Sequence, residues 1–88
     1  MIISMVIGQL DKFTQSEVKH FMRSQPFRNL VQTMRTNYMQ QILTLNPNEE
    51  VQELALQYKV LRNSLASWDE FEALIRQLDE EAERDHHH

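Results

Sequence analysis

The sequence contains no cysteine, one glycine, two prolines and one tryptophan in 88 residues. Without cysteine the chain can form neither disulfides nor zinc–thiolate sites, which suits a reducing compartment. A single glycine cannot build a glycine-rich phosphate-binding loop. Many-stranded folds need turn residues at short intervals, so this composition favours long helices joined by few turns. We therefore expect an all-α fold, organised as one helical domain over residues 1–84.

The two signs of charge are unevenly distributed along the chain. Residues 1–46 carry five basic and two acidic side chains, whereas residues 47–88 carry four basic and eleven acidic ones, and the net charge is −4. Nucleic-acid binding requires a basic footprint, so the overall acidity makes nucleic acid an unexpected partner. No apolar run approaches the roughly 20 residues of a membrane-spanning helix, and we expect no membrane association.

The first ten residues differ in character from the rest. Their large apolar side chains are mostly β-branched, which favours extended backbone: Ile2, Ile3, Val6 and Ile7. We predict an extended arm over residues 1–10. A lone strand is unstable, so the arm must pack on the helices, pair with a copy of itself, or join another protein's sheet.

Helix-start signals divide the next segment into two helices. Thr14-Gln15-Ser16-Glu17 has the spacing of a capping box and predicts a short N-terminal helix over residues 14–24. Pro26 suits the first turn of a second helix, over residues 26–45, because its missing N–H has no partner there. The apolar residues of this second helix recur every three or four positions: Phe27, Val31, Met34, Tyr38, Ile42 and Leu45.

A matching apolar stripe follows the turn Asn46-Pro47-Asn48. Asn46 is a suitable N-cap for a third helix over residues 47–66, whose seam repeats as a heptad: Val51, Leu54, Tyr58, Leu61 and Leu65. Two stripes of similar length joined by a short turn predict an antiparallel helical hairpin, stabilised mainly by burial of both seams.

A C-terminal amphipathic helix is predicted over residues 68–82. Ser67-Trp68-Asp69-Glu70 has capping-box spacing and precedes further apolar residues. A single long helix through Ser67 is the alternative, because Leu65, Trp68 and Ile75 nearly continue the seam. Residues 85–88 are expected to form a disordered tail, in which the histidines are either native or part of a purification tag.

Several apolar side chains lie off the hairpin seams. Met39 and Leu43 do so on the second helix and Leu56 and Val60 on the third, while residues 36–48 carry no charge at all. These flanks are either covered by the first and last helices or form a subunit interface. They are candidate interaction residues, together with the arm and Trp68.

Folding the hairpin gathers basic residues at its open end, away from the turn. This end holds Arg28, Arg35 and Arg62. The acidic last helix either folds back over these arginines or leaves them free to bind an acidic partner. Exposed ion pairs contribute only about 0–1 kcal/mol each, so they would decide register more than stability.

The sequence contains no recognisable catalytic or metal-binding motif. His20 is the only histidine outside the terminal cluster, and a solvated helical position is its expected environment. Two histidines one helical turn apart with a glutamate between them do not occur, and a flexible terminal cluster gives no fixed open metal site. We expect a non-enzymatic protein without cofactor or metal.

Two segments carry a resemblance to a known group of proteins. Residues 20–30 (His-Phe-Met-Arg-Ser-Gln-Pro-Phe-Arg-Asn-Leu) precede the hairpin, and residues 58–71 contain the pattern Leu-Arg-Asn-Ser-Leu. Over roughly residues 20–75 the chain resembles small helical proteins of tailed bacteriophages. That resemblance implies a role in virion assembly or host interaction, a place in the host cytoplasm or the virion, and no catalytic residues.

Three functional hypotheses follow from these features. The leading one is a small helical interaction or assembly protein, acting as a homo-oligomer or with a larger protein partner. The second is an inhibitor or regulator that places acidic residues in a basic site of a host protein. The third is a weak nucleic-acid contact through the arginines of the hairpin's open end.

Overall fold

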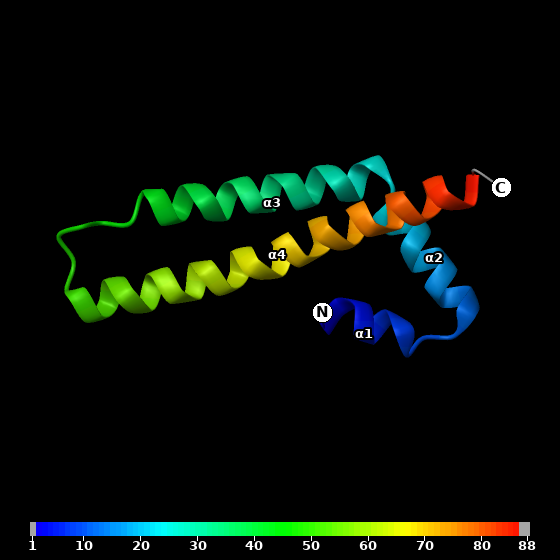
Figure 1. Ribbon diagram of the computed structural model, residues 1–88. Helices are drawn as coiled ribbons and strands as arrows, with labels where there is room; N and C mark the ends of the chain where they lie inside the picture. Colours follow the sequence, from blue (N-terminus) through cyan, green and yellow to red (C-terminus); the bar gives the residue numbers. More distant parts are fainter. Residues whose placement is uncertain (1, 87–88) are drawn as a thin grey trace.

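The computed structural model describes residues 2–86, and its main feature is an antiparallel pair of long helices (Figure 1). Two short helices, α1 (Ile2–Gly8) and α2 (Lys12–Met22), precede the long ones, α3 (Gln25–Leu43) and α4 (Val51–His86). None of residues 2–86 lies in a β-strand. The predicted all-α fold and helical hairpin are therefore confirmed.

Side-chain caps fix where α2 and α3 begin. The Asp11 carboxylate accepts hydrogen bonds from the backbone N–H of Thr14 at 2.8 Å and from the Thr14 hydroxyl at 2.7 Å. The helix predicted from Thr14 therefore starts at Lys12, because Asp11 is the N-cap. Ser24 caps α3 by accepting from the N–H of Phe27, and Pro26 lies in the first turn as predicted.

The turn between the long helices is longer than predicted. α3 ends at Leu43 and α4 begins at Val51, whereas we expected 45 and 47. Asn46 does not cap α4: its side-chain oxygen accepts a hydrogen bond from the N–H of Asn48, two residues on. This Asx-type turn satisfies the Asn46 side chain locally and delays the start of the helix.

α4 runs without interruption through the predicted break at Ser67. Neither glycine nor proline occurs after Pro47 to stop it. The Ser67 hydroxyl donates to the carbonyl oxygen of Asn63, one turn earlier, and therefore does not act as a cap. The prediction of separate helices over 47–66 and 68–82 is wrong, and the single-helix alternative is right. Asp85 continues this helix, so the predicted disordered tail is also wrong there, and residues 87–88 lie outside the described part.

The predicted extended arm is also wrong, because residues 2–8 form α1. β-Branched residues disfavour a helix by only a few tenths of a kcal/mol each, whereas full burial of an isoleucine contributes about 1.5–3 kcal/mol. Ile7 is 8% exposed in the core and Ile3 packs against it. Burial therefore outweighs intrinsic propensity, and Val6 faces solvent on the other side of the helix.

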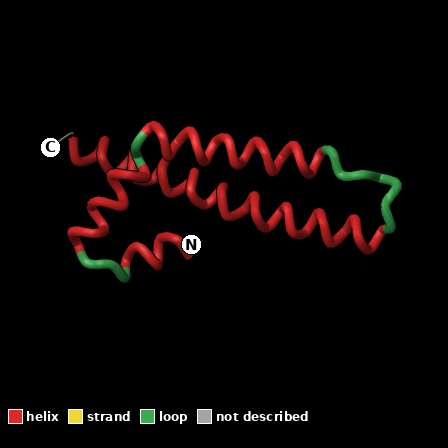
Figure 2. Tube along the Cα trace, turned by 180° about the vertical axis from the view of Figure 1, so that it is seen from behind, coloured by secondary structure: helices red, strands yellow, loops and turns green. Residues whose placement is uncertain are grey.

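The hydrophobic core lies at one end of the hairpin. Seen from behind, α1 and α2 lie near the start of α3 and the end of α4, away from the long loop (Figure 2). The core joins all four helices and comprises Ile7, Met22, Phe27, Val31, Leu74, Ile75 and Leu78. The molecule is elongated, at 57 × 24 × 19 Å, and its radius of gyration of 16.8 Å exceeds the about 12 Å expected for a compact domain of this length.

Truncating a leucine should cost stability at the core end and almost none near the loop. Leu78 is 6% exposed and Leu43 is 81% exposed. We expect Leu78→Ala to lower the free energy of unfolding by about 2–5 kcal/mol. Leu43→Ala should change it by less than about 0.5 kcal/mol. Urea unfolding followed by circular dichroism at micromolar protein concentration measures both, and equal losses would contradict this placement of the core.

Candidate functional site: the distal half of the hairpin

The part of the hairpin that projects beyond α1 and α2 has no covered core of its own. We call residues 36–63, which comprise the end of α3, the loop and the start of α4, the distal half. The eight buried side chains of the described chain all lie outside it. It carries six exposed large apolar side chains: Met39, Leu43, Val51, Leu56, Tyr58 and Val60. Isolated exposed apolar residues are ordinary, and here six lie within one pair of helices.

Two shallow grooves run between α3 and α4 in this region. One holds both of the predicted flank residues of α4 and is lined by Gln41, Thr44, Leu45, Leu56, Gln57, Val60 and Leu61. The other holds those of α3 and is lined by Arg35, Met39, Ile42, Leu43, Arg62, Leu65 and Asp69. The structure therefore gathers the four predicted flank residues into the distal half, in two separate grooves. α1 and α2 cover neither pair.

Sequence reasoning missed two residues of this surface. Val51 and Tyr58 were assigned to the buried seam of the hairpin, but they are 80% and 49% exposed. α3 ends at Leu43, so α4 has no helical partner beside its first turn. The early end of α3 could not be recognised from the seam, because Leu45 continues the apolar pattern into the turn.

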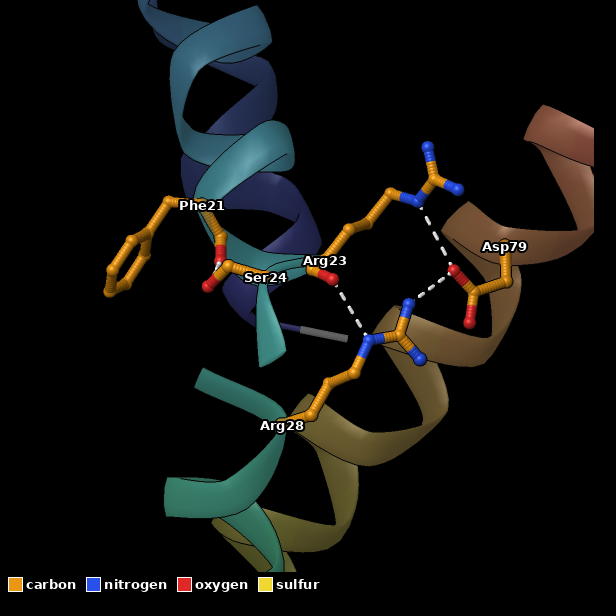
Figure 3. Close-up of polar contacts among 5 residues, drawn as sticks. All are labelled: Phe21, Arg23, Ser24, Arg28 and Asp79. Atoms are coloured by element: carbon orange, nitrogen blue, oxygen red, sulfur yellow. Dashed lines mark hydrogen bonds and ion pairs between the residues drawn. The ribbon is translucent and has the colours of Figure 1, made fainter. Parts of the chain in front are cut away.

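Arg28 and Arg35 contact carboxylates of α4, as one alternative predicted. α4 does so as one continuous helix without folding back, and Arg62, expected at the same end, lies in the distal half and joins none of these pairs. Asp79 accepts from Arg28 at 2.6 Å and from Arg23 at 3.1 Å (Figure 3). Arg28 also donates from Nε to the carbonyl oxygen of Arg23 at 2.9 Å. One arginine therefore joins the end of α2, the start of α3 and the last third of α4.

The remaining predicted contact residues fall on both sides of the boundary between the core and the distal half. Arg35 binds Asp69 at 2.6 Å and also pairs with Glu72. Trp68 is half-buried against the core and lies 5.5 Å from Phe71 between ring centroids. Arg62 is exposed in the distal half. Arg28, Arg35 and Trp68 thus contribute to the fold, and Arg62 remains accessible to a partner.

Of the arm residues predicted to contact a partner, some are buried in the core and others are exposed. Ile3 and Ile7 face the core. Val6 is 53% exposed, and neighbouring Met5 is 65% exposed. The side chain of Ile2 lies outside the described residues. Since α1 is a helix, its backbone groups are not available for strand addition.

Several hollows of residues 2–86 exceed about 300 Å³ but are wide open to solvent, and a more enclosed one is small. A cavity of about 190 Å³ lies between α1, α2 and α4, with both Lys19 and Glu81 in its wall. Ligand pockets commonly measure about 300–1,000 Å³. His20 is exposed on α2, as expected. Within residues 2–86 no three His, Asp or Glu side chains converge as metal ligands, and no helix combines the length and apolar character needed to cross a membrane.

In comparisons with known proteins, no family model, curated protein or solved structure matches this chain. Its function must therefore be argued from the surface that the fold exposes.

The ion pairs of the core end should make stability depend on acid pH. The hydrogen bond from Arg28, assisted by that from Arg23, lowers the pKa of Asp79 below its ordinary value of 3.8. A lowered folded-state pKa stabilises the fold above about pH 4, and this contribution is lost as the pH falls through the folded-state value. Because the Asp79 side chain is 37% exposed, solvent limits the contribution to about 1 kcal/mol.

We expect Asp79→Asn to reduce the loss of unfolding free energy between about pH 6 and pH 2.5 by up to about 1 kcal/mol. Urea unfolding at both pH values measures the difference. Asp85→Asn is the control, because this exposed carboxylate makes no ion pair within residues 2–86. Equal acid dependence in the wild type and in Asp79→Asn would contradict the role of the arginine contacts.

Proposed function

We propose that the protein is a non-enzymatic assembly protein that self-associates through the distal half of its hairpin. The observation that carries this proposal is that the distal half holds exposed apolar side chains but none of the buried ones. The rest of residues 2–86 holds all the buried ones and also exposes Met5, Val6, Phe13, Phe21 and Leu30. The buried residues all lie outside the distal half, which carries six exposed large apolar side chains. Covering those side chains would supply the apolar burial that drives association.

The two ends differ in what they offer a partner. The core end is closed by α1 and α2, by the caps at Asp11 and Ser24, and by the ion pairs of Asp79. The distal half is two helices thick and presents shallow grooves. A second pair of helices laid on it would complete a bundle of four, which is a stable arrangement for amphipathic helices.

The resemblance to small helical proteins of tailed bacteriophages supports a role in virion assembly, where a subunit acts by contacting copies of itself or other structural proteins. The elongated shape suits such a role, because the core lies at one end and the distal half extends away from it to the long loop (Figure 1).

The two rival hypotheses have less support from the charged residues. An acidic inhibitor would need its carboxylates free, and Asp69, Glu72 and Asp79 contact arginines of the same chain, whereas the exposed Glu80 and Glu83 join no ion pair of residues 2–86. A nucleic-acid contact would need free arginines, and the same pairs occupy Arg23, Arg28 and Arg35. Assembly through apolar side chains requires none of these groups.

A single charge in the distal half should weaken self-association. Leu43 is 81% exposed in one chain, so Leu43→Glu should leave the monomer folded while placing a carboxylate in the contact surface. We expect the wild type to sediment as a concentration-dependent oligomer, and Leu43→Glu to raise its dissociation constant by at least about tenfold. Sedimentation velocity over a wide concentration range measures both.

Phe13→Glu serves as the matched control, because Phe13 is 75% exposed on α2 and lies outside the distal half. It should associate like the wild type. A wild-type protein that stays monomeric at several hundred micromolar, or equal weakening by both substitutions, would refute self-association through the distal half.

A further inference from the structure

None of the five charged side chains of the distal half joins an ion pair of residues 2–86, and one of them, Glu49, accepts a hydrogen bond from the Gln57 amide at 2.9 Å. The five ion pairs of residues 2–86 all join arginines to Asp69, Glu72 or Asp79. Glu50, Glu53, Lys59 and Arg62 take part in none of them, and all four are exposed. Charges without an ion pair also occur elsewhere in residues 2–86, for example at Lys12, Glu17 and Asp85, but those of the distal half lie beside its exposed apolar side chains.

These four charges are sorted by sign along α4. Glu50 and Glu53 lie at the tip of the hairpin, and Lys59 and Arg62 lie nine residues further along. The nearest members of the two groups, Glu53 and Lys59, are six residues apart, which places them about 9 Å apart along the helix and on different faces. The tip is therefore acidic, and the segment behind it, which we call the shoulder, is basic.

The order of the signs decides how two copies can meet. With both tips pointing the same way, acidic tip would lie beside acidic tip and basic shoulder beside basic shoulder. With the tips pointing in opposite directions, each tip would lie beside the shoulder of the other copy. Complementary potentials of this kind fix orientation and register more than they fix affinity.

The α3 side of the distal half permits close packing. Residues 36–48 carry no charge, so a second copy could cover this stretch without burying an unpaired ion. The apolar side chains available for burial lie in two grooves, Met39 and Leu43 in one and Leu56 and Val60 in the other. A partner with the same surface offers apolar side chains in return.

We propose that the occupant of the distal half is a second copy of this chain, docked antiparallel about a two-fold axis. The acidic tip of each copy lies beside the basic shoulder of the other, and the two hairpins form a four-helix layer between two outward-pointing core ends. This inference rests on the self-association proposed above and adds its orientation. In a two-fold interface each tip–shoulder contact occurs twice, so a charge change acts twice.

Charge reversal tests the orientation. The tip variant carries Glu50→Lys and Glu53→Lys, the shoulder variant carries Lys59→Glu and Arg62→Glu, and a third variant combines all four changes. Lys12→Glu with Glu17→Lys, both exposed on α2, is the control. Circular dichroism confirms folding, and sedimentation velocity gives each dissociation constant.

We expect the tip and shoulder variants each to raise the dissociation constant by about tenfold, and the four-change variant to return it to within about threefold of wild type. The tip variant gives the clearest test of a specific contact, because its net charge rises from −4 to 0. Loss of general repulsion should strengthen association, so weakening there identifies a specific contact. The four-change variant and the control keep the wild-type net charge.

The failures of the two proposals can be distinguished. A wild-type oligomer whose tip and shoulder variants associate normally would overturn the antiparallel arrangement and leave self-association standing. The same holds if the four-change variant is as weak as the two-change variants. A wild type that is monomeric at all concentrations would overturn both.

Discussion

Phe27 and Val31 pack against Leu74 and Leu78, where the start of α3 meets the last third of α4. This contact joins segments more than 40 residues apart in sequence and creates the surface on which α1 and α2 lie. Since α1 and α2 together are short, they can add a further layer at one end only. The apolar stripes of the hairpin continue beyond that layer, and the distal half is the result. The core end of the molecule therefore maintains the fold, and the distal half has uncovered apolar surface.

The charged residues follow the same division. Around the core, Arg28 and Arg35 are neutralised by carboxylates of α4, and Arg28 also connects the end of α2 to α3. These contacts fix the register of the hairpin, because each arginine meets a carboxylate only when the two helices are correctly aligned. In the distal half the charges instead lie unpaired and sorted by sign along α4. The five ion pairs of residues 2–86 thus lie outside the distal half, as the buried side chains do.

The hairpin could be predicted because both of its apolar stripes repeat at helical spacing over several turns. Ser24 and Pro26 could also be recognised, since a helix start depends on a few local residues. The signals that failed were local patterns overruled by more distant contacts. No new helix starts at the Ser67 capping box, because α4 continues through it and thereby places Trp68 and Phe71 against the core. The β-branched residues of α1 become helical because Ile7 is buried, and burial by other segments cannot be seen in seven residues alone.

Four of the six exposed apolar residues of the distal half could be predicted from the sequence, and two could not. Met39, Leu43, Leu56 and Val60 stood out because they leave the seam, and the structure leaves all four exposed. The exposure of Val51 and Tyr58 depends on where α3 ends, and that end is decided by the loop rather than by the apolar spacing. Similarly, Arg28 and Arg35 could be placed at the open end of the hairpin. Their carboxylate partners depended on the exact path of α4.

Amide hydrogen exchange at two protein concentrations tests most directly whether the distal half is covered in solution by another copy. If it is, amides of residues 36–63 should exchange more slowly at high concentration than at low concentration. Amides near Phe27 and Val31, which are already in the core of one chain, should exchange alike at both. Exchange in residues 36–63 that does not change with concentration would contradict this view of the distal half.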